Sequence, residues 1–264
     1  MKAKATGKIN KLRVRAENVI FSNVDTVIAT TKDEQEVITT NYEVEGKIKV
    51  IPIGVDPIFF MPTFSNPIKE KYFIYVGRLE KNKGIETLFE AYKLMKTNYP
   101  NNVKLVVVGG GCKANGEFKI PKKLKENMQE IKDKIIFAGG LPQSELVNIL
   151  SNAIATIVPS YYESFGMVAA ESQAAGVPVI ATNVGGLKEV VKNETTGYLF
   201  EKKDALTLAS LMAKIYNNNY VRTKLARQAK KFARCNFDWD KVTDQITSQY
   251  KELMDEKEEI YISN

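Results

Sequence analysis

The sequence predicts an α/β fold in which a parallel β-sheet carries helices on both faces. With 264 residues, of which 44% are hydrophobic, the chain can bury a substantial core. From about residue 72 onward, short β-rich runs alternate with runs of helical periodicity, as in repeated strand–helix units. The candidate motifs all follow directly after a predicted strand, and in parallel sheets ligands bind at the carboxyl ends of the strands.

The first 55 residues predict a small group of elements that begins with a basic helix. Apolar residues recur at helical spacing between positions 9 and 20 among lysines and arginines, which indicates an amphipathic helix. The elements expected next are a strand at 25–30, a helix at about 32–41 and a strand at 47–53. The stretch 56–68 holds three prolines and lacks periodicity, so we predict a linker there, with the boundary near Pro67.

After the linker, predicted strands and helices alternate as far as residue 236, and a C-terminal helix with a charged tail occupies 237–264. The predicted strands lie at 72–77, 103–111, 134–140, 153–160, 178–182 and 197–200. The predicted helices between them lie at 84–96, 121–131, 144–151, 165–171 and 187–191. This order favours one sheet built from crossover units.

The composition excludes several classes of chemistry. The chain contains no histidine, which removes Ser-His-Asp and Cys-His nucleophile systems and most zinc or copper sites. Cys112 and Cys235 lie far apart, so neither a disulfide framework nor a zinc site is indicated. The lysine-rich N-terminus lacks the apolar core of a secretory signal and no stretch has the length of a membrane span, so we expect a cytoplasmic location. The net charge of +7 suits an anionic ligand, although lysines spread thinly would form an ordinary solvated surface.

Two cations lie close to a predicted helix start in the run YVGRLEKNKGIETL. Gly77 ends a strand, Arg78 follows at once, and Lys83 precedes Gly84 and the helix. Such a corner suits a diphosphate, because arginine can bind oxygens through two nitrogens, lysine adds a point charge and helix-end amides favour anions. The alternative is an exposed loop with incidental charges.

The glycine run 109–111 does not complete a dinucleotide fingerprint. Ala114 occupies the last glycine position, and no helix begins promptly after the run. A tight turn, or a close approach of the backbone to a ligand, fits these glycines better.

Two glutamates, Glu163 and Glu171, flank a Phe-Gly step between a strand and a helix of small residues. The first lies in the loop and the second about two turns along the helix. This spacing suits a nucleotide sugar. The amides of 164–166 could bind phosphate or sugar oxygens, Glu171 could accept hydrogen bonds from the ribose hydroxyls, and Glu163 could bind a hydroxyl of the attached sugar. In the alternative, Glu163 caps the helix and Glu171 is a buried acid satisfied by amides, although an acid in so apolar a helix is costly without a partner.

These motifs together closely resemble the retaining GT-B glycosyltransferases of family 4, also called glycosyl transferase group 1. The resemblance covers about residues 72–239 and joins G-R-x-x-x-x-K-G, P-S-x-x-E-S-F-G with its second glutamate, and G-x-P-V-I-A-T-x-x-G-G in that order. It implies a Rossmann-like donor-binding domain at 69–236. It also implies that 1–55 is a remnant of an N-terminal acceptor domain.

The resemblance assigns a role to each matching position. Arg78 and Lys83 would neutralise the donor diphosphate and stabilise it as a leaving group, Glu163 would contact the transferred sugar, and Glu171 would bind the ribose. The remaining donor-binding positions that it implies are Gly77, Leu141 near the nucleobase, Ser164, Phe165, Gly166, Gly185 and Gly186. Enzymes of this kind need neither a metal nor a cofactor, and they retain the anomeric configuration.

The run Asp238-Trp239-Asp240 has the Asp-x-Asp form of a metal–diphosphate motif from the other major glycosyltransferase fold. Here it opens a predicted helix, so a helix cap with Trp239 as a packing anchor is the better interpretation. We therefore expect no metal site. Because most of the acceptor half has no counterpart in this sequence, the 1–55 group is expected to leave an open edge and exposed apolar side chains.

The expected function is transfer of a hexose from a nucleotide sugar to a saccharide or lipid-linked acceptor in carbohydrate biosynthesis, with UDP favoured over GDP and ADP. The rival is a non-catalytic nucleotide-sugar-binding fragment or subunit that needs a partner acceptor domain. A third interpretation takes the basic first helix as a contact to an anionic membrane or a nucleic acid. No basic patch interleaved with aromatic residues supports nucleic acid, whereas peripheral contact with the inner face of a membrane stays open.

Overall fold

The computed structural model describes residues 11–42, 44, 46–61, 68–99, 102–112, 118–119, 124, 126 and 128–262. Its largest element is a sheet of six parallel strands: β3 (Tyr72–Val76), β4 (Lys104–Val108), β7 (Ile135–Gly139), β8 (Thr156–Val158), β9 (Val179–Thr182) and β10 (Gly197–Phe200). They lie in the order β10-β9-β8-β3-β4-β7, and every pairing is parallel. The predicted α/β class with a parallel sheet is confirmed.

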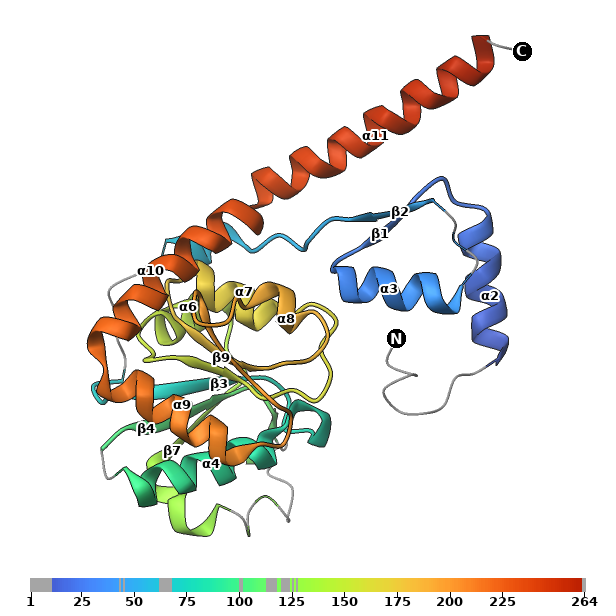
Figure 1. Ribbon diagram of the computed structural model, residues 1–264. Coiled ribbons are helices and arrows are strands. Elements are labelled where there is room, and N and C mark those ends of the chain that lie inside the picture. Colours follow the sequence, from blue (N-terminus) through green and yellow to red (C-terminus); the bar gives the residue numbers. More distant parts are fainter. Residues whose placement is uncertain are drawn as a thin grey trace.

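Helices cover both faces of this sheet (Figure 1). Alternate side chains of a strand point to opposite faces, so in β3 Phe73 and Tyr75 belong to one core cluster and Tyr72 and Ile74 to the other. The helices of the first cluster are α4 (Ile85–Asn98) and α9 (Ala205–Asn217). Those of the second are α6 (Gln143–Ser151), α7 (Met167–Ala174) and α8 (Leu187–Val190). The strands of the sheet are thus buried on both faces, which explains why their sequences are continuous apolar runs.

The strand order creates a switch point at the centre of the sheet. From β3 the chain proceeds outward to β4 and β7, and it then returns to β8 on the other side of β3 before continuing to β9 and β10. The connections that leave the carboxyl ends of β3 and β8 therefore diverge to opposite sides. A crevice is expected between two such loops, and this is where open α/β sheets bind ligands.

A separate N-terminal group contains α2 (Lys11–Ser22), β1 (Val27–Ala29), α3 (Lys32–Asn41) and β2 (Ile48–Val50). β1 and β2 pair in parallel, and Ala29, Ile38 and Val44 form a small core there. The helix at 32–41 matches its prediction, whereas the part of the first helix before residue 11 lies outside the described residues. Leu12 is 72% exposed and Val19 64%, so the apolar exposure expected for this group is present.

The chain crosses between the N-terminal group and the sheet twice, and the two crossings are adjacent. On the way out, the Val55 amide donates to the Phe237 carbonyl oxygen at 2.7 Å, and Gly54 lies under the indole of Trp239. On the way back, α10 (Asn219–Asn236) leads into the long α11 (Trp239–Ile262), which runs alongside β2 (Figure 1). Lys49 of β2 and Glu252 of α11 form an ion pair at 3.1 Å.

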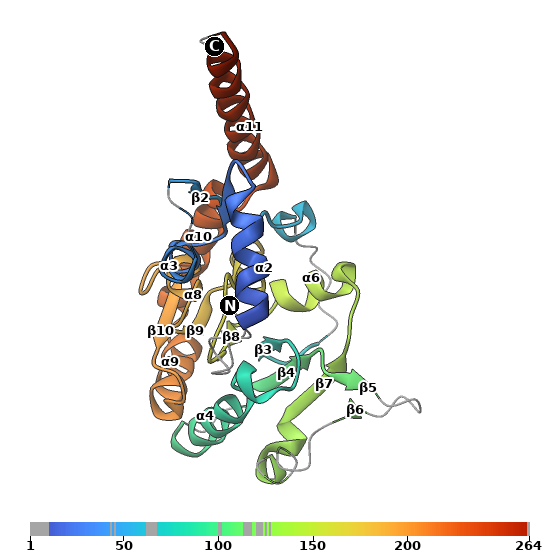
Figure 2. The ribbon, with the colours of Figure 1, turned by 90° about the vertical axis from the view of Figure 1, so that its right-hand side faces the viewer.

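Two regions differ from the sequence-based expectation. The predicted linker contains a short 3-10 helix, η1 (Pro57–Phe60), because Asp56 caps it and both Phe59 and Phe60 are buried against α6 and α7. A hairpin of β5 (Gly111–Cys112) and β6 (Phe118–Lys119) follows β4 and projects beside β7 (Figure 2). Of the helix predicted at 121–131, the described residues include Leu124 and Glu126, which are helical, and the 3-10 helix η3 (Gln129–Lys134).

Within the described residues, no helix combines the length and apolarity that crossing a bilayer requires.

Candidate active site

The loops that follow β3 and β8 enclose a cavity of about 320 Å³ at the switch point of the sheet. Seven of the predicted site residues line it: Gly77, Arg78, Lys83, Glu163, Ser164, Phe165 and Gly166. The other lining residues are Ile53, Tyr75, Val76, Val158, Ser160, Met167 and Val168. The position of the cavity is the one that the strand order predicts.

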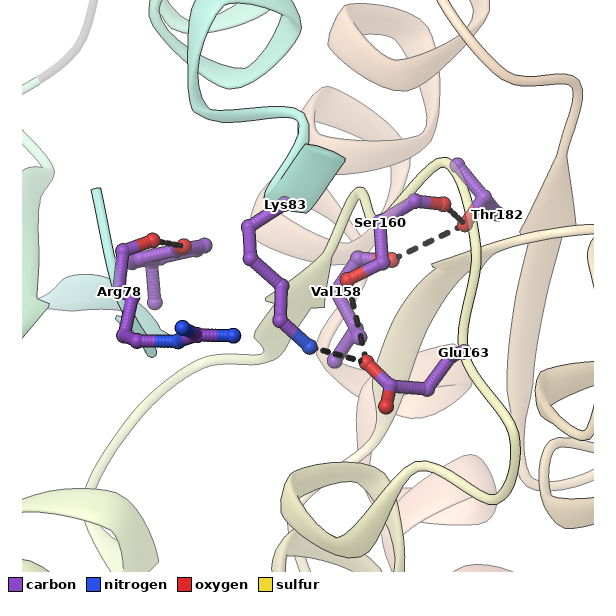
Figure 3. Close-up of polar contacts among 7 residues, drawn as sticks. Arg78, Lys83, Val158, Ser160, Glu163 and Thr182 are labelled. Carbon is purple, nitrogen blue, oxygen red and sulfur yellow. Dashed lines mark hydrogen bonds and ion pairs between the residues drawn. The ribbon is translucent and has the colours of Figure 1, made fainter. Parts of the chain in front are cut away.

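Lys83 and Glu163 meet directly inside the cavity. Lys83 Nζ lies 2.6 Å from Glu163 Oε2, and the two side chains are only 23% and 20% exposed. Ser160 Oγ donates to the same carboxylate oxygen at 3.3 Å (Figure 3). A short charge-assisted hydrogen bond in a site with limited solvent access holds both head groups in place. The cation expected at the diphosphate and the acid expected at the sugar are therefore neighbours.

Arg78 approaches the same pair from the end of β3. Its carbonyl oxygen accepts a hydrogen bond from the Tyr75 hydroxyl at 2.6 Å, which fixes the backbone at the strand end. Its side chain is 57% exposed, points toward Lys83 in Figure 3, and forms an ion pair with Glu80 at 2.7 Å. Each of the two cations thus has a carboxylate partner.

Two close backbone contacts place these loops. Gly84 has φ +66°, and a Cβ there would lie 1.8 Å from the Pro159 carbonyl oxygen, so the turn after Lys83 touches the end of β8. The Tyr161 amide donates to the Asn82 carbonyl at 2.8 Å between the same two loops. The glycine of the K-G motif is needed for this contact, because no larger residue fits.

The helix α7 begins at the cavity wall. Gly166, with φ +105°, is its N-cap, and Met167 and Val168 of its first turn line the cavity. The first amides of a helix lack intrahelical acceptors, and they carry partial positive charge. This end of α7 can therefore donate hydrogen bonds to an anionic or polar group in the cavity.

Gly185 and Gly186 lie behind the Glu163 loop and do not line the cavity. A Cβ at either position would lie 2.1 Å from a backbone oxygen, of Glu163 in the first case and of Ser164 in the second. The Gly186 amide donates to the Glu163 carbonyl at 3.0 Å. The structure thus shows these two glycines supporting the loop that carries Glu163.

Glu171 lies on α7, outside the cavity lining. Among the described residues its carboxylate makes no hydrogen bond or ion pair. Burial, together with the nearby negative charge of Asp56, raises the pKa of Glu171 to about 7. The carboxylate is thus not satisfied by helix amides, which removes the alternative explanation from the sequence.

Two other positions from the sequence do not line the cavity. Leu141 follows β7 and packs at the edge of the second core cluster. Gly109, the first glycine of the run after β4, has φ +99°, and a Cβ there would lie 2.5 Å from the Gly77 carbonyl oxygen. That glycine therefore serves the close packing of two strand ends.

Contacts from the N-terminal group to this loop were missed by the sequence analysis. Thr31, which is 2% exposed, donates from its hydroxyl to the Ser164 carbonyl at 3.2 Å. The Glu189 carboxylate accepts from the backbone amides of Lys32 and Asp33 at 3.0 and 2.9 Å. Glu189 of α8 thus caps the start of α3, and no local sequence signal reveals a cap supplied from so distant a position.

The Asp-Trp-Asp run is a helix start, as predicted. The Asp238 carboxylate accepts from the Asp240 amide at 3.1 Å, and Trp239 begins α11. Among the described residues, no cluster of three or more histidine, cysteine or acidic side chains has the arrangement of a metal site.

Comparison with known proteins places the site in a family. Residues 60–232 match the family described as glycosyl transferases group 1. D-inositol 3-phosphate glycosyltransferase of Acidothermus cellulolyticus is 31% identical over 259 residues, which are 93% of this chain and 57% of that protein. The chain therefore spans somewhat more than half the length of this relative.

Solved structures agree with the fold. Sucrose-phosphate synthase from Thermosynechococcus elongatus superposes with a TM-score of 0.81 at 30% identity, over 94% of this chain and 63% of that one. Anabaena HepE in complex with UDP-glucose superposes with a TM-score of 0.77 at 20% identity, over 92% of this chain and 68% of that one. The structural neighbours have the GT-B fold.

Proposed function

Because the chain belongs to the glycosyl transferases group 1 family, we propose that it transfers a hexose from a UDP-sugar to a saccharide or lipid-linked acceptor, with retention of the anomeric configuration. The proposal places the chain in the retaining family 4 branch. The observation that carries it is the Lys83–Glu163 pair at 2.6 Å, in one cavity with Arg78 and the start of α7.

The proposed chemistry depends on stabilising the departing diphosphate. Arg78 and Lys83 supply two positive charges, and the amides at the start of α7 supply dipoles where negative charge develops when the sugar–oxygen bond breaks. Glu163, held by Lys83 and Ser160, is placed to accept a hydrogen bond from a hydroxyl of the transferred sugar. The leaving phosphate assists removal of the acceptor proton. In this scheme no metal is needed, and EDTA leaves turnover unchanged.

The nucleoside binds along α7 in this proposal. Glu171 accepts hydrogen bonds from the two ribose hydroxyls, which supply the partners that its partly buried carboxylate lacks. The backbone near Leu141 contacts the base. We propose UDP as the nucleotide on the family resemblance and on the UDP-glucose complex of HepE.

Calorimetric titration of UDP without added metal tests the donor site. Wild type is expected to bind UDP in preference to GDP, ADP and NAD. Arg78→Ala should weaken binding by about 10- to 100-fold, the usual effect of losing a hydrogen bond to a charged group. Lys81→Ala, an exposed lysine of the same turn outside the cavity, is the matched control and should bind as wild type does. UDP binding that is unchanged by Arg78→Ala would contradict the assignment of the donor site to this cavity.

Turnover distinguishes an enzyme from a binding module. Release of UDP from UDP-glucose, with and without acceptor sugars, should be measurable for wild type and lost in Glu163→Gln. Proton NMR of the product gives the anomeric configuration, and inversion would refute retention. UDP binding without any turnover would instead support the non-catalytic alternative, in which a partner supplies the acceptor domain.

A further inference from the structure

The positive charge of this protein is concentrated in one helix. α10 carries six basic residues and no acidic residue, whereas the whole chain has a net charge of +7. The basic residues of α10 are Arg222, Lys224, Arg227, Lys230, Lys231 and Arg234. In this region the positive charge is clustered along one helix instead of being spread thinly. A helix of one sign has an electrostatic cost that interaction with an anionic partner would offset.

One side of α10 is fully used by the fold. Leu225, Ala229 and Ala233 are buried, and the helix packs against α7, α9 and β10 through this side. Figure 1 places α10 along the left-hand edge of the molecule, with its other side facing solvent. The other residues of α10 are exposed or half-buried.

A basic stripe runs along that solvent side, and we define it as Lys224, Arg227 and Lys231. All three are exposed, and with Tyr220 they fall within about 60° of the helix circumference at 100° per residue. At 1.5 Å per residue the line from Tyr220 to Lys231 is about 16 Å long. These four side chains can therefore meet one flat surface at the same time.

The stripe has no counter-charge within the described part of the chain. None of its three cations forms an ion pair there, whereas Arg234 on the same helix pairs with Asp238 at 3.5 Å and stacks over Phe60. Arg222 is also occupied, because it donates to carbonyl oxygens at the end of α9. The stripe is thus the portion of α10 that is available to a partner.

We propose that the basic stripe docks the protein on a membrane surface rich in anionic lipid. Lysine and arginine near such a surface each contribute to binding, and aromatic side chains settle at the interface between lipid and water. Tyr220, 77% exposed, adjoins one end of the stripe. Sites for single-stranded nucleic acid instead interleave aromatic stacking platforms with the cations, and no aromatic residue lies between Lys224 and Lys231.

The membrane contact then lies on α10 and not on the first helix, α2. In the described part of that helix, Arg13 is engaged by Glu17 at 2.6 Å. In Figure 1, α10 lies at the left-hand edge of the molecule and the N-terminal group at the right, so docking through the outer side of α10 leaves the N-terminal side of the cavity accessible. The proposal is independent of UDP binding.

Vesicle co-sedimentation of the full chain tests the stripe. Wild type should bind vesicles of phosphatidylcholine with phosphatidylglycerol, fail to bind phosphatidylcholine alone, and dissociate as salt rises to about 0.5 M. Lys224→Gln/Arg227→Gln/Lys231→Gln should weaken binding on the order of 100-fold, about fivefold per charge. The matched control, Lys132→Gln/Lys202→Gln/Lys251→Gln, removes the same charge from exposed sites elsewhere and should lose far less.

The outcomes separate the explanations. Equal losses in both triple variants would overturn the proposal, because net charge alone would then explain binding. Absence of binding to anionic vesicles, or tighter binding of single-stranded RNA than of vesicles at the same salt, would also overturn it. UDP affinity measured on each variant reports folding, and it should equal that of wild type because the stripe lies outside the cavity.

Discussion

Replacing Glu171 by glutamine is expected to stabilise the protein and to weaken UDP binding at the same time. The carboxylate is partly buried on a helix of small residues, and it makes no hydrogen bond or ion pair to the described residues. Its pKa is raised from 4.5 to about 7 by burial first and by the charge of Asp56 second. The folded protein therefore loses stability when this carboxylate is ionised. Glutamine avoids that loss, because its amide carries no charge.

The sign and size of the effect follow from the two pKa values. A raised folded-state pKa means that the group adds no penalty below about pH 4.5, and that its penalty grows as the pH rises toward the folded pKa of about 7. Above that pH the full cost is about 3 kcal/mol of unfolding free energy. At about pH 5 the cost is only about 1 kcal/mol. The gain in unfolding free energy from Glu171→Gln should therefore be about 2 kcal/mol larger above the folded-state pKa than at about pH 5.

Urea unfolding at a series of pH values between about 5 and 8 measures this difference. Glu90→Gln, an exposed glutamate on α4, removes the same charge and should show no such growth with pH. On the same samples, UDP titration at about pH 8 should show weaker binding for Glu171→Gln only. A gain in stability that does not change with pH would refute the burial argument, and unchanged UDP affinity would refute the ribose assignment.

Three further substitutions test separate contacts. Glu80→Gln should tighten UDP binding by up to about fivefold in calorimetry, because the ion pair that engages Arg78 is exposed and weak. Gly185→Ala should cost more than about 2 kcal/mol in urea unfolding and also weaken UDP binding, because its methyl group would strike the Glu163 carbonyl. Glu189→Gln should accelerate hydrogen exchange at the first amides of α3, because an amide oxygen caps a helix less well than a carboxylate.

Controls decide how these results are interpreted. Gly46→Ala introduces the same strain of a positive φ but meets no atom within 4 Å, so a loss equal to that of Gly185→Ala would mean that the contact with the Glu163 loop contributes nothing. Weaker UDP binding in Glu80→Gln would show that the ion pair orients Arg78 instead of competing for it. Exchange that quickens equally in α4 would point to global destabilisation by Glu189→Gln.

Much of the sheet and of the cavity could be predicted from local patterns. Strands that are buried on both faces have continuous apolar sequences, and helical periodicity predicts the helices between them. The motifs that follow β3 and β8 predicted seven of the cavity residues, because the ends of parallel strands meet at one edge. The β5–β6 hairpin was missed because strands of two residues carry no periodicity. η1 was missed because prolines and adjacent phenylalanines indicate no regular element.

The remaining features depend on contacts between distant parts of the chain. The direct ion pair of Lys83 and Glu163 joins residues 80 positions apart. The contact of Glu189 with the Asp33 amide spans 156 positions and gives α8 a role that its short sequence does not show. The family resemblance predicts that Gly185 and Gly186 lie near the donor, but only the folded loop shows that their missing side chains make room for the backbone of Glu163 and Ser164.

The adjacent crossings at Val55 and Phe237 have a topological consequence. The six-stranded unit enters and leaves at one point, so in space it is an insertion within a second unit made of the N-terminal elements and α11. Its two ends touch, so both of its junctions with the second unit lie at one place. The same arrangement joins α11 to β2, so removing α11 would deprive β2 of the Lys49–Glu252 ion pair although the entire six-stranded unit lies between these two residues in sequence.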